Sequence, residues 1–195
     1  MEHTTIDLRE NIFVLSGPSG CGKNTVYGEL KKRIPIIQRA ITVTTREPRQ
    51  NEVHGSDYYF ISEYEYLRGK DNGVFVESAF YDDAYYATPF FEIEKYSAET
   101  PVFLVIDTRG KDVIMQRYPK STSVFLMPPS VDEVLRRIRE RGANNEEQIE
   151  RRMQRAKAEV AAASSYDYVI INNDLNTCVA QIEAIVSQKL SSLIS

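Results

Sequence analysis

Short apolar runs alternate with amphipathic stretches along most of this chain. Continuous apolar runs are typical of strands buried on both faces, and apolar residues repeated every three or four positions are typical of helices. The runs predict strands at 11–17, 38–44, 102–107, 122–128 and 168–172. The repeats predict helices at 25–33, 109–118, 131–142, 146–164 and 175–190. This alternation favours an α/β fold, a mostly parallel sheet with helices on both faces.

The stretch from about 45 to 96 breaks this alternation. It contains the segments DYYFIS, EYEYLRG and GVFVESAFYDD, which are crowded with tyrosine and acidic residues. We interpret it as a small α+β inserted lobe of residues 42–96, named the inserted lobe below. The chain is then one domain, residues 1–195, whose core consists of 1–41 and 97–195.

A glycine-rich segment, GPSGCGKNT (17–25), joins the first predicted strand to the first predicted helix. Its glycines allow backbone N–H groups to turn inward around a phosphate, and Lys23 places a compact cation on the β and γ phosphates of a nucleotide. The pattern G-x-x-x-x-G-K-[ST] next expects a hydroxyl for magnesium, where this chain has Asn24. The alternative, a turn that only connects two elements, is disfavoured by the strand and helix on either side. The expected nucleotide-binding residues are Gly17, Pro18, Ser19, Gly20, Cys21, Gly22, Lys23, Asn24 and Thr25.

A second anion site is indicated at the start of the inserted lobe. Arg46 and Arg49 lie on either side of Pro48, whose fixed φ keeps the segment extended or turned, so two guanidinium groups can converge on one phosphate. Alone, REPR would be typical of solvated surface. The whole string TVTTREPRQNEVHGSDYYF (42–60), however, resembles the segment S-x-x-T-T-R-x-P-R-x-G-E-x-x-G-x-D-Y-x-F of the guanylate kinase family. The resemblance covers nearly the whole chain.

The resemblance implies a P-loop nucleoside-monophosphate kinase with a site for GMP. The residues that match the family's GMP phosphate ligands are Arg46, Arg49, Tyr58 and Tyr86, and those that match its guanine-reading residues are Thr42, Glu77, Thr88 and Asp107. Threonine stands at 42 and 88 where the family usually has serine, which preserves a hydroxyl. The chemistry of Glu77 supports this independently, because a carboxylate accepts from guanine N1–H and the exocyclic amine. The alternative for Glu77 is a solvent-facing residue on a half-buried strand.

A third group of residues lies in VDEVLRRIRERGANNEEQIERRMQ (131–154). Arg137 and Arg141 are four positions apart on one helix face, and Arg152 follows a polar stretch that we expect to form a helical lid at about 137–152. The resemblance implies that these three arginines close over the triphosphate as catalytic residues with Lys23. It also implies that Asn172, in IINNDLN, contacts the adenine. Charge-rich helices are otherwise usually solvated.

Three positions depart from the family pattern. Asn24 replaces the hydroxyl on the magnesium side, Val105 replaces the first acid of D-I-D, and Asn51 replaces the glycine before Glu52. An asparagine oxygen is a legitimate magnesium ligand, and magnesium keeps several waters, so we expect slowed rather than abolished catalysis. The leading hypothesis is magnesium-dependent transfer of the γ-phosphoryl of ATP to GMP or dGMP. The alternatives are a catalytically weak nucleotide- or protein-binding module and a kinase of another phosphorylated acceptor.

The composition of the chain indicates which partners and which cellular location to expect. The chain has 195 residues, 42% of them hydrophobic and 27% charged, with a formal net charge of -4. That balance argues against a broad nucleic-acid surface, so we expect no nucleic-acid partner. The polar start and the lack of an apolar run of about 18 residues predict a cytoplasmic protein with no membrane partner. Cys21 and Cys178 are expected to be reduced thiols, and the pattern leaves the oligomeric state open.

Overall fold

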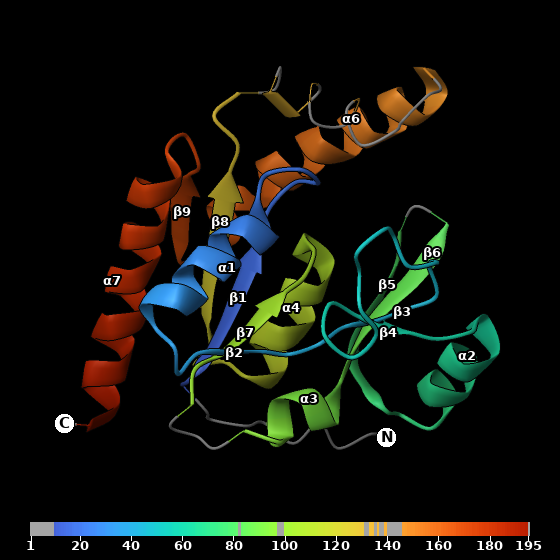
Figure 1. Ribbon diagram of the computed structural model, residues 1–195, viewed down its shortest axis with the longest axis horizontal. Helices are drawn as coiled ribbons and strands as arrows, with labels where there is room; N and C mark the ends of the chain where they lie inside the picture. The colour runs from blue at the N-terminus through green and yellow to red at the C-terminus, as the bar shows by residue number, and fades with distance from the viewer. Residues whose placement is uncertain are drawn as a thin grey trace.

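The protein is represented by a computed structural model that describes residues 10–81, 83–96, 100–130, 133, 134, 136, 139 and 146–194 (Figure 1). The strands are β1 (Ile12–Ser16), β2 (Gln38–Arg39), β3 (Val43–Thr44), β4 (Tyr59–Phe60), β5 (Phe75–Tyr81), β6 (Ala84–Pro89), β7 (Val102–Val105), β8 (Thr122–Met127) and β9 (Tyr168–Ile171). The helices are α1 (Lys23–Arg33), α2 (Glu63–Asp71), α3 (Phe90–Glu94), α4 (Thr108–Arg117), α6 (Glu146–Ala161), the 3-10 helix η1 (Ala162–Ser165) and α7 (Leu175–Ile194).

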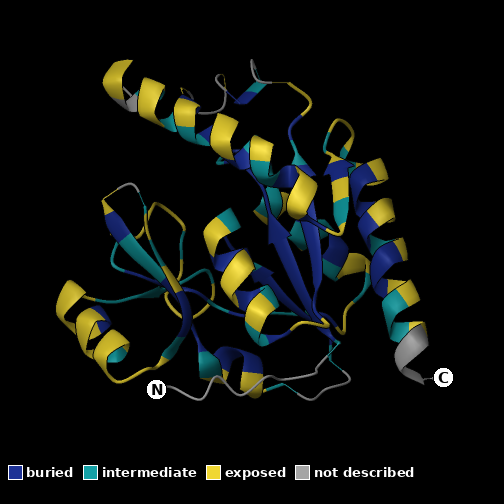
Figure 2. Cartoon of the chain, turned by 180° about the vertical axis from the view of Figure 1, so that it is seen from behind, coloured by how far each residue is buried: buried dark blue, intermediate teal, exposed yellow. Residues whose placement is uncertain are grey.

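The core is a five-stranded parallel sheet in the order β2-β7-β1-β8-β9. Every residue of the central strand β1 is buried, because both faces of the sheet are covered. Phe13 and Leu15 pack against residues of α1 and α7, whereas Ile12 and Val14 pack with Ile114 of α4 on the opposite face. Figure 2 shows the same arrangement, with buried strands between helices whose outer faces are exposed. The α/β fold predicted from the sequence is confirmed.

A second sheet of four strands, in the order β4-β3-β6-β5, lies entirely within the inserted lobe. β3 is parallel to β4 and antiparallel to β6, and β5 and β6 form an antiparallel pair. The aromatic residues of this segment pack on one another, and the rings of Tyr66 and Tyr85 stack with centroids 4.3 Å apart. The limits of the lobe and the lid stay predictions, although mixed α and β elements are found in the lobe.

The predicted single strand 38–44 is wrong, because the chain leaves one sheet and enters the other within it. Ala40 N still donates to Phe103 O in the core at 2.9 Å. The next N–H, on Ile41, instead donates to Oε2 of Glu92 at 2.7 Å. Glu92 lies on α3 and is fully buried, so it ends the core ladder before β3 begins. A sequence pattern of apolar residues does not reveal this change of partner.

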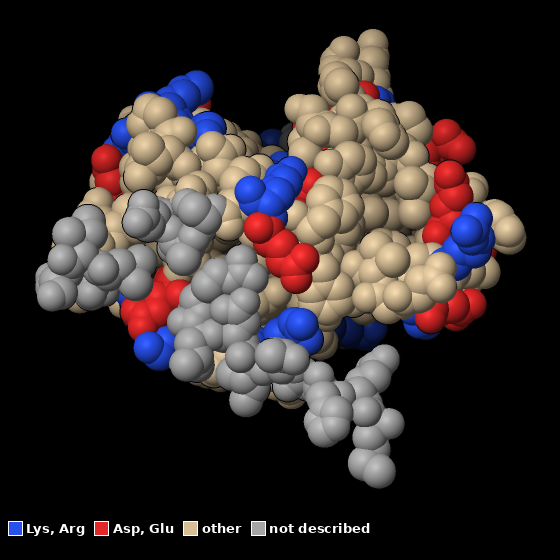
Figure 3. All heavy atoms as spheres, turned by 90° about the horizontal axis from the view of Figure 1, so that it is seen from below, with Lys and Arg blue, Asp and Glu red and all other residues tan. Residues whose placement is uncertain are grey.

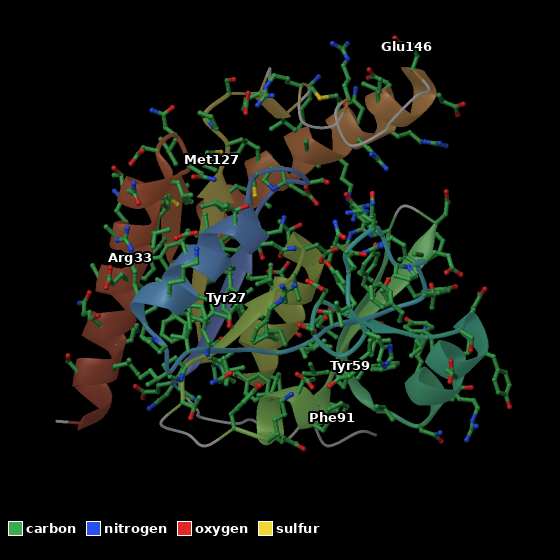
Figure 4. All side chains as sticks on the ribbon, in the orientation of Figure 1. Tyr27, Arg33, Tyr59, Phe91, Met127 and Glu146 are labelled. Carbon is green, nitrogen blue, oxygen red and sulfur yellow. The ribbon has the colours of Figure 1, made fainter. Side chains whose placement is uncertain are left out.

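Glu92 also links α3 to β4 within the inserted lobe. Its Oε1 accepts from the hydroxyl of Tyr59 at 2.8 Å and from Lys95 at 2.6 Å. Tyr59 lies beside Phe91 of the same helix, with ring centroids 6.0 Å apart (Figure 4). The crossing between core and lobe is therefore held by one buried carboxylate and its neighbours.

Charged side chains of both signs are distributed over the surface. On the face seen in Figure 3, basic and acidic side chains lie in small mixed groups among neutral atoms. Several are ion pairs, such as Lys120 with Glu10 at 2.5 Å and Lys95 with Glu92.

Among the helices that the structure describes, we find none with the length and apolar character needed to cross a membrane.

Candidate active site

One cavity lies between the carboxyl end of the core sheet and the inserted lobe. Its walls come from the glycine-rich segment after β1, from the segment after β7, from β5 and β6 of the lobe, and from α6. In Figure 1, α6 runs across the top of the molecule from the core sheet toward the side of the lobe. Parallel sheets generally bind ligands at the carboxyl ends of their strands, and this cavity has that position.

The glycine-rich segment has the backbone that a phosphate cradle needs. Gly17 has φ 149°, and a Cβ added there would lie 2.4 Å from Leu126 O, so no larger residue fits. Gly22 precedes α1 with φ 98° and provides no side-chain cap, which leaves the first N–H groups of α1 available at the cavity. A helix N-terminus with free N–H groups is an anion site. Lys23 begins α1, and its Nζ donates to Gly17 O at 2.6 Å and Pro18 O at 3.1 Å.

Asn172 supports this segment from behind. Its Nδ2 donates to Cys21 O at 2.8 Å, while its backbone N–H donates to Met127 O at 2.8 Å. The side chain thus links the loop after β9 to the glycine-rich segment. Cys21 itself is fully buried against Gly17.

On the opposite wall, Arg46 is held at both ends of its guanidinium group. Its Nη1 and Nη2 donate to the two carboxylate oxygens of Glu52 at 2.8 and 2.9 Å, and its Nε donates to the hydroxyl of Tyr86 at 3.2 Å. Its carbon Cζ lies 5.3 Å from the centre of the Tyr58 ring. Burial opposes the charge, but the bonds to Glu52 and Tyr86 raise the pKa of Arg46 above its ordinary value.

Glu52 organises both arginines of this wall. Besides binding Arg46, its Oε2 accepts from the backbone N–H of Arg49 at 2.7 Å. Burial alone would raise the pKa of Glu52, but the hydrogen bonds from Arg46 and from the Arg49 backbone lower it, so the carboxylate stays ionised. Asn51, just before it, has φ 72°. This left-handed conformation favours glycine, and asparagine is one of the few other residues that adopt it.

A buried carboxyl group, Glu77, lies deeper in the same cavity. Its side chain is on β5, with only 6% of the residue exposed, and its Oε1 accepts from the hydroxyl of Thr88 on β6 at 2.5 Å. Burial raises the pKa of Glu77 to about 7; the Thr88 hydrogen bond opposes the rise and the negative charge of Asp107 adds to it. Gly110 is closely packed here, since a Cβ there would lie 2.7 Å from Glu77 Oε2.

Asp107, whose negative charge acts on Glu77, belongs to the core. It precedes α4, and its Oδ1 accepts from Gly110 N at 2.8 Å as the helix N-cap. Its Oδ2 lies 3.6 Å from Nη2 of Arg155 on α6. Glu159, one turn further along α6, is also buried and lines the cavity. Burial raises the pKa of Glu159 above its ordinary value, and the positive charges of Lys23 and Arg155 offset only part of this rise.

Comparisons with known proteins identify the family. The sequence profile described as guanylate kinase matches residues 9–189. A guanylate kinase from Carboxydothermus hydrogenoformans is 40% identical over 177 residues, which are 90% of this chain and 87% of the relative. One from Desulfitobacterium hafniense is 38% identical over 90% of this chain and 88% of the relative. A solved guanylate kinase from Anaplasma phagocytophilum aligns with a TM-score of 0.76 at 32% identity, over 92% of this chain and 85% of that one.

The chain belongs to the guanylate kinase family. It is therefore an enzyme, a kinase of the nucleoside-monophosphate class, and the resemblance noted in its sequence is confirmed.

The structure brings most residues expected from the guanylate kinase pattern to one cavity. Those that line it are Gly17, Ser19, Gly20, Gly22, Lys23, Asn24, Thr25, Thr42, Arg46, Arg49, Tyr58, Glu77, Tyr86, Asp107 and Arg152. Four expected residues are not part of this lining. Pro18 and Thr88 bind the lining residues Lys23 and Glu77, and Asn172 binds Cys21, which packs against Gly17. Arg137 and Arg141 lie outside the described residues. The ligands of all these residues stay predictions.

Two of the three departures from the family pattern, Asn24 and Val105, also line the cavity. Asn24 is exposed in the first turn of α1, and Thr25 beside it is exposed to the same space. Val105 is half-buried at the end of β7 and packs against the core. The sequence therefore places one amide and one apolar group on this wall.

Sequence reasoning missed four further residues of the cavity region: Glu52, Tyr81, Arg155 and Glu159. A signal for Glu52 was present, because an acid three positions after Arg49 is well placed to bind the arginines. Arg155 and Glu159 are four positions apart on one helix and have the spacing of an ion pair. The contact of Arg155 with Asp107 depends on the tertiary fold, so no local pattern reveals it.

Proposed function

We propose that this enzyme transfers the γ-phosphoryl group of ATP to GMP, or to dGMP, giving ADP and GDP. The observation that carries the proposal is a cavity lined on one wall by the glycine-rich loop and on the other by a buried carboxyl group, Glu77, and two arginines. The curated relatives are named guanylate kinases, which supports the same acceptor for this chain.

The wall formed by the glycine-rich segment (17–25) and the N-terminus of α1, named the donor wall below, is suited to a triphosphate. The N–H groups of the glycine-rich loop and the N-terminus of α1 provide positive potential, and Lys23 supplies a movable ammonium group. Its hydrogen bonds to Gly17 and Pro18 carbonyls would be exchanged for phosphate oxygens. Arg152, on α6 at the same cavity, adds positive charge from the lid side.

The opposite wall, formed by the inserted lobe and named the acceptor wall below, is suited to a purine monophosphate. Arg46, Arg49, Tyr58 and Tyr86 would hold the phosphate, whose oxygen is already anionic and needs no strong general base to attack. Arg46 has five N–H donors, and the bonds to Tyr86, Glu47 and Glu52 use four of them. With respect to the described residues, one N–H on Nη2 thus stays available for the acceptor phosphate. Glu77 and Asp107 would accept from the N–H groups of guanine, with hydroxyls from Thr42 and Thr88 beside them.

The residues of the donor wall also fit a magnesium ion bound mainly by phosphates and water. Asn24 offers one amide oxygen at the cavity and Val105 offers none, which suits a cation that keeps several water ligands. Bound there, magnesium would neutralise charge on the β and γ phosphates. Asn24 would be its protein ligand.

The assay that tests the proposal uses the purified full chain with ATP, magnesium and each of GMP, dGMP, AMP, CMP and UMP. We expect turnover with GMP and dGMP and little with the other nucleotides, because Glu77 pairs with guanine N1–H and the exocyclic amine. Turnover with GMP no faster than with AMP would refute the proposed acceptor. A cytoplasmic location and the lack of a nucleic-acid partner remain predictions from composition.

A second candidate is a catalytically weak module of the same family that binds nucleotides or a protein. Asn24 and Val105 favour it, since both replace magnesium-side groups and both line the cavity. Lys23 and Arg152 at the same cavity argue against it, because a pure binding module has no chemical use for them. A kinase for another phosphorylated acceptor is the third candidate, and the buried Glu77 makes it the weakest.

A further inference from the structure

Arg155 connects three parts of the molecule that are distant in sequence. It lies on α6, with 26% of its side chain exposed. Its Cζ lies 3.5 Å from the centre of the Tyr81 ring, which belongs to β5 of the inserted lobe. Its Nη2 lies 3.6 Å from Asp107 Oδ2, and its Nε lies 3.4 Å from Glu159 Oε1. One guanidinium group thus joins α6 to the lobe and to the core.

Arg155 and Tyr81 are close enough for the guanidinium group to stack on the ring. A guanidinium group stacks well on an aromatic ring because it is planar and more weakly hydrated than an ammonium group. Tyr81 itself lies edge-on to Tyr86, with ring centroids 6.0 Å apart, and Tyr86 binds Arg46. A continuous set of contacts therefore runs from α6 to the acceptor wall.

The Asp107 contact fixes the orientation of a carboxylate at the cavity. Oδ1 of Asp107 is bound by the backbone of Gly110 and Oδ2 faces Arg155, and each oxygen can accept a further hydrogen bond. Without Arg155, the carboxylate of Asp107 would keep the hydrogen bond from Gly110 but lose the ion pair. Its negative charge, which acts on Glu77, would then be less compensated by positive charge.

We propose that Arg155 is a positioning residue for base recognition: it holds Asp107 ready for the exocyclic amine of a guanine and anchors α6 on Tyr81 of the inserted lobe. The inference rests on the proposed function and adds to it a residue that touches neither nucleotide. Recognition of the amine is thereby coupled to α6, whose first turns belong to the predicted lid. Arg155 acts through Asp107, so its loss affects acceptors that carry the amine and spares those that lack it.

The test compares the dissociation constants of GMP and inosine monophosphate, measured by calorimetry on the full chain. Inosine monophosphate keeps the ring N–H of guanine but lacks the exocyclic amine. We expect Arg155→Met to weaken GMP about tenfold, the usual effect of one lost interaction with a charged group, and to change inosine monophosphate less than about twofold. Arg155→Lys keeps the charge but not the flat stack, so it is expected to lose only about threefold for GMP.

The control is Arg151→Met on the same helix. Arg151 is an exposed partner of Glu147 at 3.6 Å, so both affinities are expected to stay unchanged. A double-mutant cycle adds Asp107→Asn, which keeps a capping side chain. In that background Arg155→Met should have little further effect on GMP.

Three results would overturn the proposal. Equal weakening of GMP and inosine monophosphate would make Arg155 only a structural link, and no weakening of GMP would leave it without a role. If Arg155→Met does not fold, Arg155→Lys is judged on the same comparison. If the unaltered protein binds GMP no more tightly than inosine monophosphate, the exocyclic amine is not recognised and the role of Arg155 fails, whereas the proposed function is judged separately by turnover with GMP and AMP.

Discussion

The hydroxyl of Thr88 donates a hydrogen bond of 2.5 Å to Oε1 of Glu77 across the β5–β6 pair. This bond holds a carboxyl group in the interior of the inserted lobe, where burial raises its pKa to about 7. The group therefore changes charge near neutral pH, while an exposed glutamate would stay ionised. From the proposed role of Glu77 in base recognition, we therefore expect that recognition to depend on pH.

The first prediction concerns GMP affinity as a function of pH. An ionised Glu77 accepts from both guanine donors, whereas a protonated one presents a donor to them. Below about pH 7, we expect the dissociation constant to rise by up to about tenfold for each unit of pH. Calorimetry between about pH 5.5 and 8.5, on the order of six points, checks this against Glu77→Gln, which should bind weakly without that dependence. A parallel pH dependence in both proteins would contradict the assignment.

A second prediction concerns stability without any ligand. The folded pKa of Glu77, about 7, lies above its ordinary value of 4.5, so the folded state holds the proton more tightly. The stabilisation is fully present below about pH 4.5 and is lost as pH rises to about 7. Denaturant unfolding should show a smaller fall in the free energy of unfolding across this window for Glu77→Gln than for the parent protein. An identical pH slope in the two proteins would refute the raised pKa.

Much of the donor wall could be predicted from sequence, because its chemistry is local. The positions Gly17 to Thr25 follow one another in the chain, and the dihedral angles that the loop needs restrict which residues fit. Lys23 is at the start of α1, two residues earlier than the predicted helix begins. The described helices and most strands of the core follow from the sequence for the same reason, since their periodic patterns are local.

The acceptor wall was less accessible to sequence reasoning. Its key relationships join residues far apart in the chain, such as Asp107 with Arg155 and Arg46 with Tyr86. The pattern of β5 left open whether Glu77 faced solvent, and only the packing of Thr88 and Gly110 shows that it is buried. In the sequence, the charge of Arg155 also does not distinguish its role from that of Arg151, which is exposed to solvent.

The third prediction concerns Lys23. Its ammonium group lies among the loop carbonyls at the donor wall, so Lys23→Met should lower kcat about 10²- to 10³-fold, the usual effect of losing one preorganised charge. GMP affinity should stay within about twofold, because the acceptor wall is separate. Steady-state kinetics and calorimetry measure the two effects. The control is Lys32→Met, since Lys32 is exposed and pairs with Glu29. A kcat that stays unchanged in Lys23→Met would exclude its proposed role.

The fourth prediction concerns the part of the cavity where we propose that magnesium binds. Asn24→Ser combined with Val105→Asp restores the usual hydroxyl and acid, so we expect kcat to rise about 10- to 100-fold and half-saturation to need less magnesium. A magnesium titration of the rate checks both effects. Recovery from no measurable activity would instead favour the binding-module alternative. If neither quantity changes, these two positions do not limit catalysis.

The last prediction concerns the packing of Gly110 against Glu77. A Cβ at Gly110 would lie 2.7 Å from Glu77 Oε2 and 3.1 Å from its carboxyl carbon, so Gly110→Ala must displace the carboxyl group. We expect GMP affinity to fall about tenfold, the usual effect of losing one hydrogen bond to a charged group.

Gly28→Ala on α1 is the matched control, because a Cβ added at Gly28 would have no atom of the described residues within 4 Å beyond its own stretch of helix. Alanine favours a helix over glycine by about 1 kcal/mol, so this variant should be slightly more stable and bind GMP normally. Calorimetry and thermal unfolding of both variants separate the two effects. Normal GMP binding by Gly110→Ala would mean that the carboxyl group of Glu77 can move without loss, and base recognition would then have to rest on Asp107 and the threonine hydroxyls.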